Sequence, residues 1–471
     1  MMSRKPGRQF AACAAALMAS AAGGCRTYEP RALDMEGHRD AWLARTPADP
    51  AVAAYAQRMA EEGRPVRDGF DLRDGVSLAE AEAVAMVFNP DLRMARLRAG
   101  VALATAENAG LWQDPELGVD VQRILESVDE PWKVFTTIGV TIPISGRLEL
   151  EKKSARTEHA LELVEVARAE WETRIALRRA WIEWSALRED AAAAREFVLV
   201  AEATTKIVDR LEEAGEIARI EARLFRVELA QRRSELRGIE AQLEQAELEI
   251  KAIMGLAPGA PVELRAWGLG ESATGSMDEL MLAAGERNPR LAAARSAYAA
   301  AEAALELEVR KQYPDIMIGP GYGREEGMDQ FLFGVSLPLP FVNGNRQAIA
   351  EAEAKREEAR GAFETEYERL WGEVSKAESR LRAAEAQRRI IEEDVVPLVD
   401  AQYADTRKLA ELGEVNTFVL LESLAQSLEA KRQLIAARKE ESLARAALRE
   451  IVGPEAGAGA GDAVPAEEET P

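Results

Sequence analysis

Few residues of this chain combine a reactive side chain with a spacing that suggests chemistry. Its histidines are His38 and His159, and its cysteines are Cys13 and Cys25. No His-x-x-x-His pair, cysteine cluster or glycine-rich phosphate loop appears in the sequence. The 82 acidic side chains alternate with basic ones at the spacing of helical charge pairs, which solvated helix faces explain. The sequence therefore predicts no catalytic residue, no metal site and no cofactor.

Cys25 is the reactive side chain with the clearest context. The first residues are basic and the stretch Phe10 to Ala22 is apolar, which is typical of an export signal and too short to cross a bilayer as a helix. Ala22-Gly23-Gly24-Cys25 resembles the lipobox of bacterial lipoproteins, although Leu is usual where Ala22 stands. We expect residues 1–24 to be a signal peptide and Cys25 to be lipidated. Cleavage nearby without lipidation is the alternative.

Composition and charge narrow the class of protein. The chain has 471 residues and 47% hydrophobic content, enough for two or three domains, and its formal charge of −22 excludes an extended nucleic-acid partner. Only 6% of residues are aromatic, and Ala, Glu, Arg and Leu dominate. That composition is typical of long helices and coiled coils.

One unit of sequence occurs twice, which constrains the fold more than any single window. Five short matches recur in the same order: Asn89-Pro90-Asp91-Leu92 with Asn288-Pro289-Arg290-Leu291, Pro115-Glu116-Leu117 with Pro314-Asp315-Ile316, residues 138–143 with 333–338, 214–217 with 412–415, and 253–255 with 451–453. The repeat divides the chain as follows: a lipidated N-terminal extension at 25–75, a first repeat at 76–255, a linker at 256–287, a second repeat at 288–453 and a disordered tail at 454–471.

Each repeat is predicted to contain a helix, two strands and a long helical hairpin. The first helices begin at Pro90 and Pro289, and the strands are expected at about 115–126, 132–143, 313–323 and 330–340, where apolar and polar residues alternate. The apolar seam of a coiled coil runs through the last helix of the first repeat: Phe225, Leu229, Leu236, Ile239, Leu243, Ala246, Ile250 and Ile253. About 60 helical residues span roughly 90 Å, which no compact domain needs.

The strands carry the main physical inference. Segments of about ten residues with alternating polarity match outer-membrane strands. Backbone polar groups in lipid must all be paired, so such a sheet has to close, and four strands are too few to close a barrel. We therefore expect several copies to share one barrel, with Asp120, Gln122 and Lys133 toward the lumen. A small soluble β subdomain packed on the helices is the alternative.

The duplicated unit, the Gly-Glu pair at each hairpin turn and Ala-Gly-Leu-Trp-Gln-Asp-Pro-Glu-Leu at 109–117 resemble the TolC-like outer-membrane efflux family. The phrase at 109–117 is most similar to the heavy-metal-efflux (CzcC-type) branch. The resemblance implies a mainly α protein with membrane β structure: a homotrimer whose twelve strands close one β-barrel, continued by an α-barrel of helical hairpins. It also implies a lipid-anchored location in the bacterial outer membrane, reaching into the periplasm.

The resemblance further implies a passive exit duct that a periplasmic adaptor couples to an inner-membrane pump. Metal cations are suggested as cargo only by the likeness to the CzcC type. The alternative that the sequence leaves open is a periplasmic coiled-coil lipoprotein that acts as a scaffold or adaptor.

The same resemblance assigns roles to particular residues. It places Gly215, Glu216, Gly413 and Glu414 at the periplasmic tip, where the family meets its adaptor. The plainer interpretation is that each Gly caps a helix end and each Glu favours the start of the next helix. Glu422 aligns with an acidic position that constricts the pore in the family, while the neighbouring acidic position is occupied by Val419. A solvated helix charge is the alternative for Glu422.

Overall fold

The computed structural model of the protein describes residues 27–61, 70–125, 132–266, 276–325, 328–411 and 417–454. The chain divides into two compact units, residues 1–45 and 46–471. In the first unit the described element is the helix α2 (Met35–Leu43), whose N-cap Asp34 accepts a hydrogen bond from the backbone N–H of Gly37. The second unit carries the repeat.

The second unit shows the same order of elements twice. The first copy comprises α4 (Leu78–Phe88), α5 (Pro90–Glu107), β1 (Glu116–Arg123), β2 (Trp132–Ile142), α6 (Arg147–Glu213) and α7 (Arg219–Ile253), preceded by α3 (Pro50–Glu61) and the short 3-10 helix η1 (Leu72–Asp74). The second comprises α8 (Met277–Arg287), α9 (Pro289–Arg310), β3 (Ile316–Glu325), β4 (Met328–Ser336), α10 (Arg346–Ile390), the π-helix η2 (Ile391–Val395), α11 (Val396–Glu411) and α12 (Thr417–Val452). The expected helix–strand–strand–hairpin order is therefore present in both halves.

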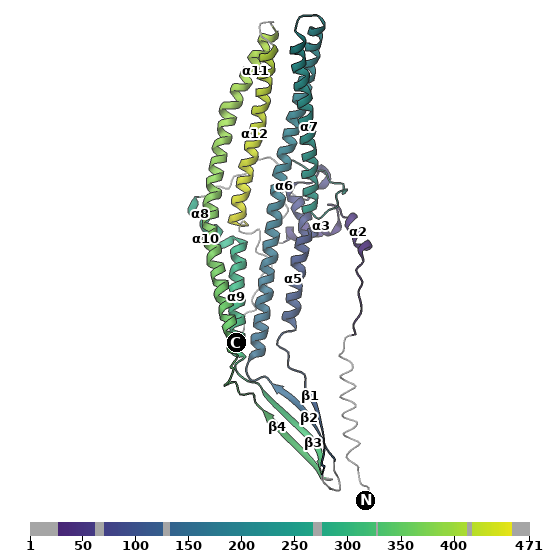
Figure 1. Cartoon of the computed structure of the whole chain (residues 1–471), viewed down its shortest axis with the longest axis vertical. Coiled ribbons are helices and arrows are strands. Elements are labelled where there is room, and N and C mark those ends of the chain that lie inside the picture. Colours follow the sequence, from purple (N-terminus) through teal and green to yellow (C-terminus); the bar gives the residue numbers. More distant parts are fainter. Residues whose placement is uncertain are drawn as a thin grey trace. The chain divides into compact units, whose positions relative to one another are not determined.

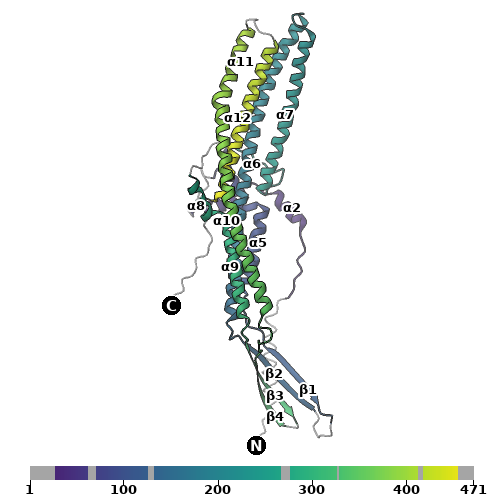
Figure 2. The ribbon, with the colours of Figure 1, turned by 60° about the vertical axis from the view of Figure 1, so that its left-hand side comes forward.

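Within this unit each repeat builds two long helical columns. In the first repeat α6 forms one column of 67 residues, and α7 and α5 lie end to end beside it (Figure 1). In the second repeat α10 and α11 form one column, and α12 and α9 form the other (Figure 2). Strands β1 to β4 follow at the end of the columns where α5 and α9 finish.

An asparagine joins the two helices of each end-to-end column. The Asn89 side chain accepts from the backbone N–H groups of Asp91 and Leu92, which caps α5, and its Nδ2 donates to the carbonyl of Ile253 at 2.8 Å. Asn288 does the same for α9 and donates to the carbonyl of Ile451 at 2.7 Å. One amide side chain thus satisfies orphan groups of two helix ends at once.

A glycine completes each of these joints. Gly255 lies just beyond α7 with φ +72°, and a Cβ there would lie 2.1 Å from the carbonyl oxygen of Phe88. Gly453 has φ +91°, and its Cβ would lie 2.4 Å from the carbonyl oxygen of Arg287. Both the left-handed backbone and the close approach of the chain require glycine.

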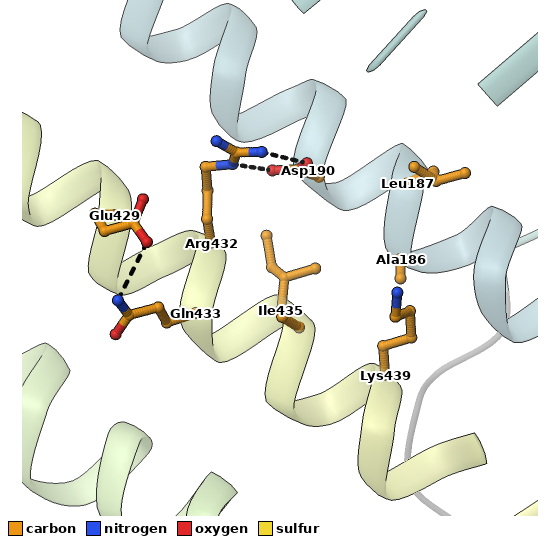
Figure 3. A pocket seen from close by; sticks show the side chains of 9 residues that line it. Ala186, Leu187, Asp190, Glu429, Arg432, Gln433, Ile435 and Lys439 are labelled. Atoms are coloured by element: carbon orange, nitrogen blue, oxygen red, sulfur yellow. Dashed lines mark hydrogen bonds and ion pairs between the residues drawn. The ribbon is translucent and has the colours of Figure 1, made fainter. Parts of the chain in front are cut away.

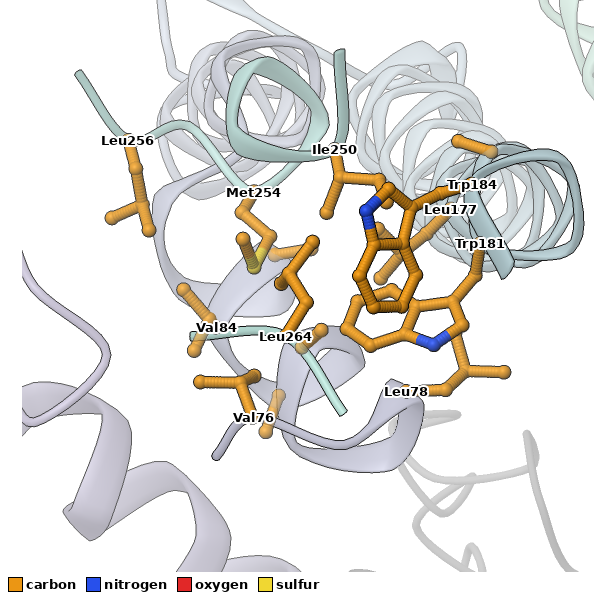
Figure 4. Close-up of a cluster of buried hydrophobic side chains, with 14 of the residues drawn as sticks. Val76, Leu78, Val84, Leu177, Trp181, Trp184, Ile250, Met254, Leu256 and Leu264 are labelled. Atoms are coloured by element: carbon orange, nitrogen blue, oxygen red, sulfur yellow. The ribbon is translucent and has the colours of Figure 1, made fainter. Parts of the chain in front are cut away.

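Tryptophans on α6 anchor the largest buried cluster of the first repeat (Figure 4). Trp181 and Trp184 meet edge to face at 5.8 Å between ring centroids, and the Trp181 indole N–H donates to the carbonyl of Arg265 at 3.1 Å. Residues from α4 and the segment just before it, from the end of α7 and from the segment after α7 pack around them: Val76, Leu78, Val84, Ile250, Met254, Leu256 and Leu264. This cluster fixes the joint between α7 and α5 against the middle of α6.

The four strands form one antiparallel sheet in the order β1-β2-β3-β4. The central pairing of β2 with β3 joins the two repeats. From the sequence, the strand-linking stretches near 127–131 and 324–329 are expected to be exposed outer loops. The β3–β4 ladder includes Arg324 with Asp329 and Glu325 with Met328, so the second link is shorter than expected and comprises 326–327, which lie outside the described residues. The other expected loop, at 127–131, lies outside the described residues. No described helix has both the length and the apolar character to cross a membrane.

The glycine joint yields a stability prediction. Gly255→Ala should destabilise the protein by roughly 2 kcal/mol or more, because the side chain is forced into a left-handed backbone and against the Phe88 carbonyl. Gly238→Ala is the matched control, since a Cβ there meets nothing within 4 Å, and Ala stabilises a helix interior by roughly 0.5–1 kcal/mol relative to Gly. Thermal unfolding followed by circular dichroism measures both changes. Equal melting temperatures for the two variants would contradict this account of the joint.

Candidate functional site

The sheet has two chemically different faces. Paired residues of an antiparallel ladder share a face, and successive residues alternate. The register therefore places Leu117, Val119, Val121, Val134, Val140, Ile318, Phe331, Phe333 and Val335 on one side. Glu116, Asp120, Gln122, Lys133, Thr137, Thr141, Glu325 and Gln330 lie on the other. Asp120, Gln122 and Lys133 are thus on the face opposite Leu117, Val119, Val134 and Val140, the division that the sequence predicted.

The apolar face is uncovered. Phe331 is 75% exposed and Phe333 62%, although a soluble sheet normally covers such side chains. The strands have 8, 11, 10 and 9 residues in chain order, close to the length that spans a bilayer when tilted. The face therefore has the size and chemistry of a surface that meets lipid.

On the polar face, a glycine and one ion pair connect neighbouring strands. Phe135 lies on this side, and its ring covers Gly323, where a Cβ would lie 2.0 Å from the Phe135 Cδ1. Lys133 pairs with Glu325 across β2 and β3, and Gln330 donates to the same carboxylate at 3.2 Å. These contacts link the two repeats near the turn end of the sheet.

Aromatic residues stand at both ends of the strands. Trp132 and Tyr322 lie toward the turn end, and the Arg123 guanidinium stacks over the Trp132 ring at 5.5 Å. Trp112 and Tyr313 precede the strands at the helical end. All four rings are exposed, as expected for aromatic residues that anchor a sheet at the two interfaces of a membrane.

Both edges of the sheet are open. Within the part of the chain that the structure describes, β1 pairs only with β2 and β4 only with β3. Each edge strand thus presents backbone N–H and C=O groups that its own chain does not pair. An ion pair holds the sheet to the helices: Arg147 at the start of α6 donates to Asp315, just before β3, at 2.7 Å.

The tip of the first hairpin is a well-defined cap. Gly215 has φ +76°, and the N–H groups of Gly215 and Glu216 donate to the carbonyls of Glu212 and Leu211 at 3.0 and 2.9 Å. This is the arrangement of a Schellman motif, so the predicted capping role of Gly215 is present. The Glu216 side chain is exposed. Gly413, Glu414 and Cys25 lie outside the described residues.

Glu422 is exposed on α12 and accepts a hydrogen bond from Gln426 at 3.0 Å. Nearby, leucines of α12 pack against α6 of the first hairpin: Leu421 lies with Val208, and Leu424 and Leu428 with Phe197. Lower down, Arg432 of α12 donates twice to Asp190 of α6, at 2.8 and 3.2 Å. No local sequence pattern could reveal these contacts between hairpins, because each joins residues more than two hundred positions apart.

Metal-binding geometry is not seen in the region that the structure describes, where no three His, Cys, Asp or Glu side chains come together as ligands. The described residues form a sheet with one exposed apolar face, one polar face and two open edges, together with two helical hairpins.

Comparison with known proteins agrees with this geometry. The family model described as outer membrane efflux protein matches residues 84–256 and 280–454. The cobalt-zinc-cadmium resistance protein CzcC of Cupriavidus metallidurans is 24% identical over 243 residues. That match covers 51% of this chain and 58% of CzcC, so the chain spans little more than half of that relative's length.

Solved structures share the fold. The outer membrane protein VceC of Vibrio cholerae superposes with a TM-score of 0.66 at 19% identity, over 80% of this chain and 96% of VceC. CusC, whose structures concern folding and transmembrane channel formation, superposes with a TM-score of 0.67 at 14% identity, over 91% of this chain and 99% of CusC. These likenesses confirm the TolC-like fold predicted from the duplicated unit. Since the family model takes in the strands and the helical hairpins of both repeats, the chain belongs to the outer membrane efflux protein family.

Proposed function

We propose that this protein is the outer-membrane channel subunit of a tripartite efflux system, a passive exit duct that a periplasmic adaptor couples to an inner-membrane pump. The observation that supports it most is the sheet, which has one apolar face, one polar face and two open edges. In lipid, only further strands can satisfy the edge groups of β1 and β4. Three copies of a four-stranded sheet give a twelve-stranded barrel, large enough to close.

An exposed stripe on α5 supports the same assembly. Met94, Leu97 and Val101 lie on one side of α5 and are exposed. Asn288 is the counterpart of Asn89 in the second repeat. At the same distance along the sequence, the counterparts of Met94 and Val101 are Ala293 and Ala300, which are buried on α9. Because α9 packs on α6 of the other repeat, we infer that α5 packs on α10, the counterpart of α6, in a neighbouring copy.

The partners of the duct would dock at the hairpin tips, where Gly215, Glu216, Gly413 and Glu414 are the proposed adaptor contacts. The channel would be passive, so the energy for transport would come from the pump. In this proposal Cys25 carries the lipid anchor in the outer membrane, and the columns extend into the periplasm.

Heavy-metal cations are the cargo that we propose. CzcC is named for resistance to cobalt, zinc and cadmium. On the polar face of the sheet, Glu116, Asp120 and Glu325 outnumber Lys133, which favours cations in a lumen lined by that face. A periplasmic scaffold would instead bury the apolar face against its own helices, which leaves the exposed Phe331 and Phe333 unexplained.

A pair of adjacent substitutions tests the location of the sheet. Val119→Arg places a charge on the apolar face, which costs roughly 2–4 kcal/mol near the middle of a bilayer, whereas Asp120→Arg places the same side chain at the same depth on the polar face. We expect Val119→Arg to reduce heat-modifiable oligomers in the outer-membrane fraction strongly and Asp120→Arg to leave them. A soluble sheet would tolerate both changes, and equal yields of the two variants would contradict the proposal.

Glu422 is proposed as the residue that constricts the duct. Three carboxylates around an axis would attract cations, so Glu422→Gln should lower the cation preference of the reconstituted channel and its block by divalent cations. Glu429→Gln is the matched control, because Glu429 accepts from Gln433 at 3.1 Å as Glu422 does from Gln426 at 3.0 Å, but lies two helical turns farther from the tip. Single-channel conductance with a salt gradient measures both variants. An unchanged reversal potential and block for Glu422→Gln would remove Glu422 from the gate.

A further inference from the structure

The apolar row of β4 continues past the end of the strand. The strand ends at Ser336, and residues 337–339 have no regular structure in the single chain. Leu339 is nevertheless 66% exposed and Phe341 77%. Apolar side chains stand at every second position on both sides of Ser336: Phe331, Phe333 and Val335 before it, and Leu337, Leu339 and Phe341 after it. The segment after β4 therefore has the side-chain pattern of a strand.

Two prolines show which side of this segment is open. Successive residues of a strand direct their N–H and C=O groups to opposite sides. Gly334 directs its carbonyl at β3, since a Cβ on the opposite Gly319 would meet that oxygen at 4.0 Å. Pro338 and Pro340 have the parity of Gly334, so the N–H donors that they lack are on the β3 side, where the ladder stops at Ser336. The N–H groups of Leu337, Leu339 and Phe341 are thus on the open side.

The free edge of β1 has the matching parity. A Cβ on Gly139 of β2 would lie 3.8 Å from the carbonyl oxygen of the opposite Glu116, so the even-numbered residues of β1 direct their backbone at β2. Leu117, Val119 and Val121 direct theirs at the open edge. When these residues pair with the odd-numbered residues of β4, the free donors and acceptors meet, and the apolar side chains stay on one face. A shift by one residue would lose both.

One separation in sequence relates the two hairpins of the sheet. It relates the first residues of α5 and α9, and those of α6 and α10. In the first hairpin, Glu116 lies opposite Gly139. Their counterparts at this separation, Asp315 and Pro338, come to lie opposite each other when the β3–β4 ladder is continued two residues beyond Ser336. The two ladders therefore have the same register.

The structural correspondence differs from the short sequence match. The match of 138–143 with 333–338 sets Ile138 against Phe333. The ladders instead make Leu337 the counterpart of Ile138. Residues 134–142, which form most of β2, then correspond to 333–341, so the counterpart of β2 includes the segment beyond Ser336.

The junction between the repeats predicts the junction between two copies. Within one chain the helices of the two repeats meet where Arg432 pairs with Asp190 (Figure 3), and the strands meet where β2 pairs with β3. The β2–β3 ladder sets residues 134–142 against 316–324. The last residue of that stretch of β2 lies opposite the first residue of β3, so the strands are level at the helical end.

The counterparts of these two stretches are residues 333–341 and 117–125, and both border open edges of the sheet. Set against each other in the same register, they are again level at the helical end. Four of the five pairs on the apolar face join two apolar side chains, which stabilises a ladder. The pairs are Phe333 with Leu125, Val335 with Arg123, Leu337 with Val121, Leu339 with Val119, and Phe341 with Leu117.

We propose that residues 337–341 join β4 only in the assembly, where the lengthened strand pairs with β1 of a second copy in this register. The proposal rests on the proposed function, which requires the two edges to meet but leaves open which residues pair. It explains why an apolar row with free N–H groups follows β4 in the single chain: its partner strand belongs to another copy.

Disulfide cross-linking in the full-length assembly reads the register. On the polar face, the proposed register sets Ser336 opposite Gln122 of the second copy. Slips by two or four residues also keep the faces aligned, and they would set Gly334 or Leu332 there. Gln122→Cys is therefore combined in turn with Ser336→Cys, Gly334→Cys and Leu332→Cys. A Cβ at Gly334 meets its nearest atom at 3.7 Å, an ordinary contact.

We expect the pair at 122 and 336 to give the strongest disulfide between chains. Directly opposite residues have Cα atoms about 4.5–5.5 Å apart, whereas diagonal neighbours lie at or beyond the roughly 7 Å that a disulfide can span. The four single-cysteine variants are the controls, and they also show any background from Cys25. A stronger cross-link at Gly334 or Leu332 would overturn the register.

Hydrogen exchange tests the lengthened strand without any substitution. In the assembled protein, the amides of Leu337 and Leu339 should be protected to within about tenfold of those of Ile138 and Val140, their counterparts in β2. Exchange about a hundredfold or more faster than in β2 would show an unpaired segment and overturn the proposal. This measurement keeps the test valid if a cysteine variant fails to fold.

Failure of this proposal is distinguishable from failure of the proposed function. Absence of a cross-link from all three pairs, in oligomers that are still recovered from the outer-membrane fraction, would overturn the pairing of β4 with β1 in any of these registers. The location of the sheet in the membrane is reported separately by Val119→Arg and Asp120→Arg.

Discussion

Unpaired backbone groups at the edges of a sheet are the constraint on which the rest of this structure depends. The strands β1 and β4 each have one partner in their own chain, and the apolar face between them is uncovered. In water such a sheet would invite aggregation, and in lipid it would be incompatible with the membrane unless it closed. Both constraints are met if the sheet is one segment of a closed barrel. The polar face, with its Lys133–Glu325 pair, then faces the inside of that barrel.

The helices are arranged in the same way in both repeats and continue from the sheet. Each repeat provides two columns, and in each the shorter helices are joined end to end by an Asn and a Gly that satisfy both helix ends. These joints place the two shorter helices of each repeat end to end in one column. The second hairpin differs from the first at one level, where the π-helix η2 interrupts its long column and the nearly buried Glu441 of α12 pairs with Arg388 and Arg445.

Local chemistry explains what could be predicted from the sequence. The Asn-Pro helix starts, the αL glycine at Gly215 and the alternating strands each depend on neighbouring residues, and the repeat shows each signal twice. The link between β3 and β4 is shorter than the predicted 324–329, because Arg324 pairs with Asp329 and Glu325 with Met328 in the ladder. Periodicity could not separate solvated charges from buried ones, since Glu441 and Arg445 have the ordinary i,i+4 spacing and only the packing shows that Glu441 is buried. Contacts such as Arg147 with Asp315 depend on the folded chain, and the roles of Cys25, Glu422 and the tip residues remain predictions.

The mass of the protein in detergent, measured by light scattering with correction for bound detergent, tests most directly whether the sheet is completed by other copies. We expect a particle that contains three chains, and loss of strand structure when the chains separate. A monodisperse single chain, soluble without detergent and with its sheet intact, would contradict it.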